Sequence, residues 1–120
     1  MDEIVTAGDE LRARARELAD NKEWWVKGEP RREGQMCAAF NFMGTRITRK
    51  YEAFTPETMR QLQRWLPRYI REAFPNIVNG MWGGGNRLPH YMEVTFFNDT
   101  IARDVDDVIV MLEKGAAEIG

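Results

Sequence analysis

The feature that most constrains the fold is an apolar stripe near the end of the chain, within residues 96–119. The apolar side chains recur there with the periodicity of one face of an α-helix: Ile101, Val105, Val108, Ile109, Leu112 and Ala116. Asn98 or Asp99 is expected to cap the first free N–H groups of this helix, and Lys114 suits the negative end of its dipole. Because one face is apolar, the helix needs apolar partners from the rest of the chain.

The first partner helix is predicted near the N-terminus. Thr6 and Asp9 match a capping box in which Asp replaces Glu. The narrow apolar face that follows consists of Leu11, Ala15 and Leu18. With Asn21 as the stop, the pattern predicts a helix from about Ala7 to Asp20.

The second partner helix carries a row of arginines. Thr55 is expected to cap it, and Pro56 suits the first helical position. Its apolar face is predicted to hold Met59, Leu62, Trp65, Leu66, Tyr69, Ile70 and Ala73. The opposite face, called the arginine face below, carries Arg60, Arg64, Arg68 and Arg71. Pro67 inside the helix predicts a kink near residues 63–66.

The remaining segments give weaker signals. Residues 36–54 are compatible either with a buried helix or with a β hairpin, since Thr45, Ile47, Arg49 and Tyr51 alternate as in a strand. Residues 76–88 are predicted to be a loop, and residues 91–97 a short strand. The expected fold is therefore mostly α. It is a single domain over residues 1–120, built as a compact bundle of three to four helices, to which a short β hairpin or strand pair could be added.

Composition excludes several classes of protein. Cys37 is the only cysteine of the 120 residues, so an intrachain disulfide is impossible and a zinc site lacks ligands. No apolar run approaches the roughly 18 residues that a membrane-spanning helix needs. The acidic start, Met1-Asp2-Glu3, has the wrong charge for a signal peptide. The expected location is the cytoplasm, with no membrane as partner.

The charges are unevenly distributed along the chain. Residues 1–26 carry four basic and seven acidic side chains, residues 27–71 carry ten and four, and residues 72–120 carry three and eight. A basic middle thus lies between two acidic ends, although the formal net charge is only −2.

Three local patterns resemble a known protein family. They are Trp24 or Trp25 with Gly28, then Cys37-Ala38, then Phe97-Asn98-Asp99 ahead of the last helix. Together they resemble a family of small uncharacterised proteins from actinobacteria and their bacteriophages. Members carry Trp-x-x-Gly, Cys-Ala-x-Gly-Ala and aromatic-Asn-Asp elements, and Phe40 departs from this pattern where the family tends to have glycine. The resemblance implies a largely helical, cytosolic, phage-encoded protein, and it implies no activity.

Candidate catalytic residues are few. His90 is the only histidine and has no second polar partner near it in sequence. Cys37 has apolar neighbours, which raise the pKa of a thiol and reduce its reactivity. Gly83-Gly84-Gly85 could cradle a phosphate, but the Lys-Ser/Thr of a P-loop is absent. A flexible loop that presents Trp82 and Arg87 as contact residues is the other interpretation. We expect no enzyme, no cofactor and no metal site, and Asn98-Asp99 is interpreted as a cap rather than a metal site.

The arginine face is the strongest candidate for function. Like charges four residues apart on a helix repel each other, so neighbouring acidic groups or a partner should offset them. The arginine face therefore has three interpretations: a solvated face, a contact for an acidic protein surface, or a surface that follows a nucleic-acid backbone. The leading hypothesis is an accessory protein that binds another protein, and the alternative is a nucleic-acid-binding protein. The candidate binding residues are Arg60, Arg64, Arg68, Arg71, Trp82 and Arg87.

Overall fold

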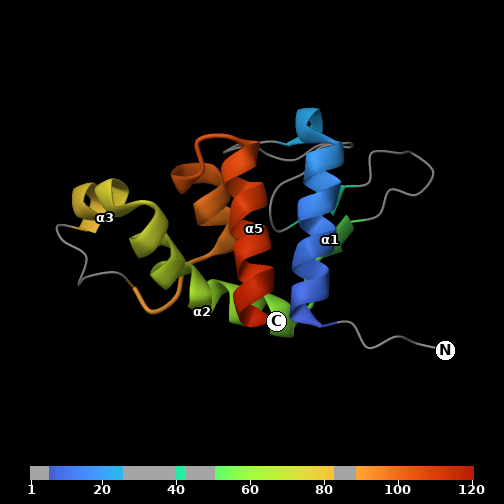
Figure 1. Cartoon of the computed structure of the whole chain (residues 1–120), viewed down its shortest axis with the longest axis horizontal. Coiled ribbons are helices and arrows are strands. Elements are labelled where there is room, and N and C mark those ends of the chain that lie inside the picture. Colours follow the sequence, from blue (N-terminus) through green and yellow to red (C-terminus); the bar gives the residue numbers. More distant parts are fainter. Residues whose placement is uncertain (1–5, 26–39, 43–50, 83–88) are drawn as a thin grey trace.

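The computed structural model describes residues 6–25, 40–42, 51–82 and 89–120 (Figure 1). The elements along the chain are α1 (Ala7–Asp20), the 3-10 turn η1 (Lys22–Trp24), β1 (Phe40–Phe42), β2 (Tyr51–Ala53), α2 (Pro56–Ala73), α3 (Pro75–Trp82), α4 (Val94–Phe96), the π-helical segment η3 (Phe97–Ile101) and α5 (Val105–Ile119). The fold is mostly α, as predicted. No helix in these ranges is long and apolar enough to cross a membrane.

The first and the last helix lie side by side and antiparallel (Figure 1). A Cβ atom added to Gly8 would lie 2.6 Å from the carbonyl carbon of Gly120 and 3.1 Å from the carbonyl oxygen of Ala116. Glycine therefore allows the start of α1 to approach the end of α5 this closely. The bounds predicted for α1 are confirmed, and Thr6 and Asp9 form the reciprocal hydrogen bonds of a capping box.

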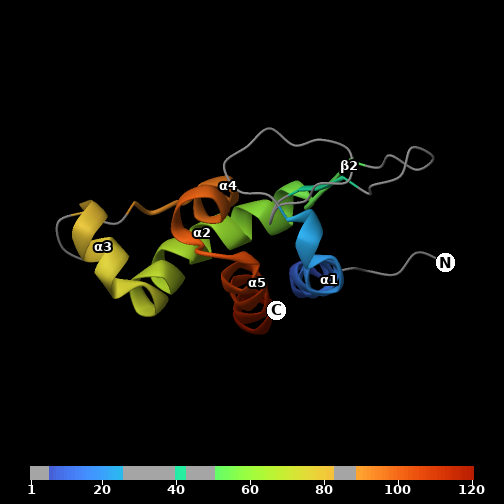
Figure 2. The same ribbon diagram turned by 90° about the horizontal axis from the view of Figure 1, so that it is seen from above.

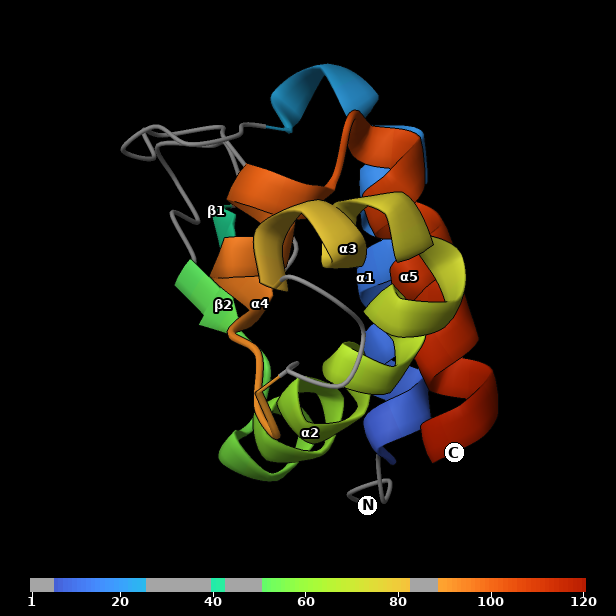
Figure 3. The same cartoon turned by 90° about the vertical axis from the view of Figure 1, so that its left-hand side faces the viewer.

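Helix α2 crosses the α1–α5 pair and forms the middle of the molecule (Figure 2). α1 and α5 lie on one side of it, and α4 and the strand pair lie on the other (Figures 2 and 3). Gly115 is buried where the three long helices meet. A Cβ atom added there would lie 3.3 Å from Leu62 Cδ1 and Trp65 Cζ3 of α2, and 3.4 Å from Leu11 Cδ1 of α1. The largest fully buried side chains are Phe97, Leu11, Leu18, Leu62, Leu66, Ile70, Ile101, Met111, Leu112, Val78 and Val94.

The start of α2 matches the prediction, with Thr55 as the cap and Pro56 in the first turn. The helix continues through Pro67 to Ala73. Proline has no N–H group, so the carbonyl of Gln63 loses its usual donor four residues on. The backbone N–H of Met92 takes that place and donates to the Gln63 oxygen at 2.9 Å. On the predicted apolar face only Ala73 is exposed.

Two segments differ from the sequence prediction. The strand predicted over residues 91–97 is wrong, because Val94–Phe96 is a helical turn that leads into η3. Gln63 explains this start, since its side-chain Oε1 accepts from the Val94 N–H at 3.0 Å and so caps the turn. The loop predicted over residues 76–88 is wrong for residues 76–82, which belong to α3. Pro75 fits the first position of that helix, and Val78 is buried.

Helix α5 begins later than its apolar stripe predicted. Asp104 is its N-cap and accepts a hydrogen bond from the N–H of Asp107 at 3.1 Å. Asn98 and Asp99, the predicted caps, lie in η3 instead. The stripe continues across this break because Ile101 is fully buried although it precedes α5.

The strands β1 and β2 pair antiparallel, with Phe40 opposite Ala53 and Phe42 opposite Tyr51. Of the two alternatives for residues 36–54, the described part is therefore a strand pair. The other residues of that segment, including Cys37, lie outside the described residues.

Candidate functional site

All four side chains of the arginine face are exposed on α2. Arg60 forms an ion pair with Glu57, one turn earlier in the same helix. Arg68 Nη2 lies 3.0 Å from Glu118 Oε1, in the last turn of α5. Within the described part of the chain, Arg64 and Arg71 form no ion pair. Acidic groups of the same fold thus neutralise two of the four arginines and leave two for solvent or a partner.

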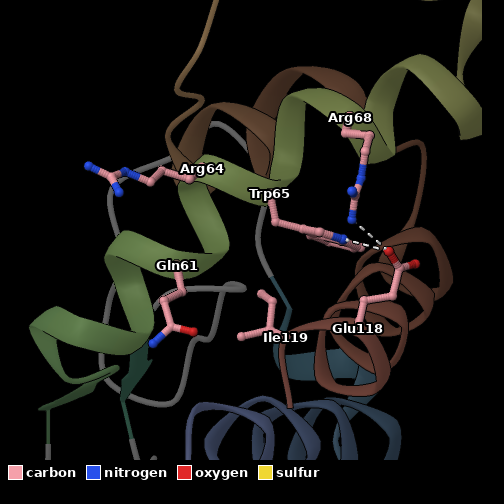
Figure 4. A pocket seen from close by; sticks show the side chains of 6 residues that line it. All are labelled: Gln61, Arg64, Trp65, Arg68, Glu118 and Ile119. Atoms are coloured by element: carbon pink, nitrogen blue, oxygen red, sulfur yellow. Dashed lines mark hydrogen bonds and ion pairs between the residues drawn. The ribbon is translucent and has the colours of Figure 1, made fainter.

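A surface hollow of about 410 Å³ lies beside this face, between α2 and the end of α5 (Figure 4). We call it the Trp65 hollow, and its lining consists of Gln61, Arg64, Trp65, Arg68, Glu118 and Ile119. Trp65 Nε1 donates to Glu118 Oε1 at 3.1 Å, so the indole and the Arg68 guanidinium share one carboxylate oxygen. Arg64 extends away from this group in Figure 4. The hollow therefore combines an apolar wall, two cations and one anion.

A smaller hollow of about 210 Å³ also has Glu118 in its lining, together with Tyr69, Glu72, Ala73 and Lys114. Tyr69 stacks on Trp65 with 4.8 Å between the ring centroids, which holds the indole in place from behind. Burial raises the pKa of the Tyr69 hydroxyl, and the negative charge of Asp107 raises it further. Tyr69 is therefore neutral at physiological pH. Glu118 takes part in the lining of both hollows.

Sequence reasoning missed Glu118, although one signal was present. A carboxylate in the last turn of a helix lies near the negative end of the dipole, where cations are favoured. The last turn of α5 contains no basic residue. An acidic side chain in that position is unfavourable for its own helix, which indicates a contact with another element. Here Glu118 accepts hydrogen bonds from Trp65 and Arg68 on α2.

The structure also brings together residues from two of the family-like motifs. Trp25 Nε1 donates to Asn98 Oδ1 at 2.7 Å, and Asn98 Nδ2 donates to Asp99 Oδ1 at 2.8 Å. Asn98 is fully buried. The aromatic-Asn-Asp element therefore ties the segment after α1 to η3, and it does not cap the last helix.

The other candidate residues of the sequence lie apart from this site or cannot be placed. His90 is exposed. Trp82 ends α3, and its side chain lies outside the described residues, as do Arg87 and Gly83-Gly84-Gly85. Among the residues that the structure describes, no group of three His, Cys, Asp or Glu side chains could hold a metal ion.

The sequence from residue 4 to residue 118 matches one protein-family model, described as a family of unknown function (DUF6197). Comparison with curated proteins and with solved structures finds no match. The family match covers α1, α2 and α5 together, and so includes every residue of the arginine face.

Proposed function

Since this chain belongs to DUF6197, a family of unknown function, we propose its function from its own surface. It is a small accessory protein that acts by binding another protein, and the arginine face with the Trp65 hollow is the contact surface. The resemblance of its sequence motifs to small proteins of actinobacteria and their bacteriophages supports the further proposal of a cytoplasmic, phage-encoded protein, which its gene neighbourhood would test.

The composition of the hollow is the observation that carries this proposal. Tryptophan and arginine are the residue types that most often dominate binding energy at protein interfaces. Here an indole edge, the aliphatic Ile119 and the Arg68 guanidinium line one depression, and Arg64 lines it with its guanidinium pointing away from them. Arginine can bind a carboxylate with two parallel hydrogen bonds, which fits an acidic protein surface.

The same composition disfavours the alternative of nucleic-acid binding. A phosphate backbone that followed the arginine face would meet Glu57 beside Arg60 and Glu118 beside Arg68. Pairing with these carboxylates reduces the number of counterions that binding to a nucleic acid can release. The sequence pI of about 5.5 also opposes general affinity for nucleic acid.

A double substitution tests the proposal. Arg64→Gln with Arg68→Gln should leave the helical circular dichroism spectrum unchanged, because both side chains are exposed. The partner is first identified by crosslinking to the wild-type chain in host cells and is then purified. The double substitution should weaken the affinity for this partner by at least about tenfold. Arg16→Gln, an exposed arginine on α1, is the matched control and should bind as the parent does.

Unchanged affinity of the folded double variant would refute the role of this face. If the crosslinked partner is instead DNA or RNA, and its binding weakens steeply as salt rises, the alternative function is correct.

A further inference from the structure

We propose that the Trp65 hollow receives an acidic segment of the partner protein, and that Glu118 occupies the place of the partner's carboxylate until the partner binds. The inference rests on the proposed function. It adds the chemistry of the partner and an internal competitor that sets the strength of binding.

The first argument is the kind of group that the hollow already holds. Trp65 Nε1 and Arg68 Nη2 converge on the same oxygen, Glu118 Oε1, at 3.1 and 3.0 Å. An indole N–H and a guanidinium are donors only, so the group between them must be an acceptor, and a negative charge suits the guanidinium best. The two donors come from one helix, α2, so their backbone positions do not depend on which carboxylate they bind.

The second argument is that Glu118 is easily displaced. The Arg68 and Glu118 side chains are 64% and 43% exposed, and exposed ion pairs contribute little to stability. The helix dipole also disfavours a carboxylate in the last turn of α5. Trp65 is only 7% exposed and stacks on Tyr69, so the indole stays in place when Glu118 leaves. Displacement therefore requires a side-chain rotation and no unfolding.

The third argument concerns what surrounds the two donors. Arg64, which lines the same hollow, is exposed and has no ion pair among the described residues, so it can bind a second carboxylate. Ile119 offers a half-buried apolar contact on the opposite side. Charge complementarity thus selects a segment in which acidic residues flank an apolar one. A phosphate backbone lacks the apolar group that would contact Ile119.

The test measures the affinity of the full chain for a short fluorescein-labelled peptide of glutamate and leucine, by fluorescence anisotropy. Glu118→Gln removes the competing charge with little change of shape. It should raise the affinity about two- to fivefold, the range that an exposed ion pair allows. Arg68→Gln should lower it by about three- to fivefold. Glu113→Gln, an exposed glutamate on the same helix outside the hollow, is the matched control and should leave the affinity unchanged.

A double-variant cycle separates displacement from a general effect of charge. If Glu118 and the peptide compete for the same two donors, Glu118→Gln should give a clearly smaller gain in the Arg68→Gln background, where only the Trp65 indole N–H is left to compete for. An equal gain in both backgrounds would overturn the competition.

In the wild-type chain, the nuclear magnetic resonance signal of the Trp65 indole N–H should shift as the glutamate peptide is added. It should stay in place with a peptide of glutamine and leucine.

The outcomes distinguish the two proposals. If Arg64→Gln with Arg68→Gln weakens partner binding but Glu118→Gln gives no gain, the internal competitor is refuted and the proposed function stands. If none of these variants changes binding, both are refuted. An oligonucleotide, or an excess of the unlabelled chain, that displaces the labelled peptide more effectively than the unlabelled glutamate–leucine peptide does would assign the hollow to a different occupant.

Discussion

At the scale of single residues, buried or half-buried polar side chains join segments that are far apart in the sequence. Gln63 holds the segment before α4 through its backbone oxygen, its side-chain Oε1 and its Nε2, which donates to the Tyr91 hydroxyl at 2.7 Å. Glu10 on α1 accepts hydrogen bonds from the backbone N–H and the hydroxyl of Thr55, and from the Thr58 hydroxyl, at the start of α2. A carboxylate at a helix N-terminus is favoured by the dipole, so Glu10 stabilises α2 as well as its contact with α1.

The bond between Trp25 and Asn98 gives a prediction at this scale. Trp25→Phe keeps an aromatic ring but removes the N–H that donates to Asn98 Oδ1. Because Asn98 is fully buried, the free energy of unfolding should fall by about 1–3 kcal/mol, as measured by urea denaturation. Tyr91→Phe is the control. Tyr91 is 50% exposed, so water can replace its hydroxyl and the loss should be smaller. Equal stability of Trp25→Phe and the parent would show that this bond contributes nothing.

At the scale of elements, the start of α5 gives the second prediction. Asp104→Ala should lower the free energy of unfolding by about 0.5–2 kcal/mol, because the N–H of Asp107 loses its cap. Asp104→Asn should restore most of the stability, since asparagine caps as well as aspartate. Asp106→Ala removes an exposed acid from the same turn without removing a cap, and should cost less. A helix capped by Asp99 would instead tolerate Asp104→Ala.

The elements that sequence could predict are those whose signals are local. The bounds of α1 and the start of α2 follow from Thr6 and Thr55, whose side chains cap residues three positions on. The starts of α4 and α5 could not be predicted in the same way. Gln63, a residue of another helix, caps Val94, and η3 interrupts the apolar stripe before Asp104. Alternation of apolar residues near Val94 reflects burial against α2 rather than a strand.

The candidate site also has one part that local sequence signals predict and one part that depends on tertiary contacts. The exposure of the arginine face follows from helical periodicity, and the structure agrees with it. Its pairing with Glu118 depends on how α5 crosses α2, a tertiary contact between residues 50 positions apart. Asn98 is a predicted cap of the last helix, but it accepts a hydrogen bond from Trp25 instead. This contact is also tertiary, because Trp25 is 73 positions away in the sequence.

At the scale of the whole molecule, the core depends on the contacts of α5 with α1 and α2. Leu112 is fully buried in this core. Leu112→Ala should lower the free energy of unfolding by about 2–5 kcal/mol, the usual cost of a large-to-small change in a core. Val110→Ala, on the same helix but 46% exposed, should change it by less than about 0.5 kcal/mol. A denaturation midpoint for Leu112→Ala close to that of the parent would show that α5 is not central to the core.

The antiparallel pairing of α1 with α5 also has a consequence during synthesis. The apolar face of α1 leaves the ribosome well before α5, the helix that covers it. Closing so long a loop costs entropy, and contacts between distant residues slow folding. Ribosome-bound chains arrested before residue 105 are therefore expected to be cut by protease within α1, whereas released full chains are expected to resist. Protection of α1 in the arrested chains would mean that another segment covers it first. A translating cell thus holds α1 uncovered until the ribosome has made α5.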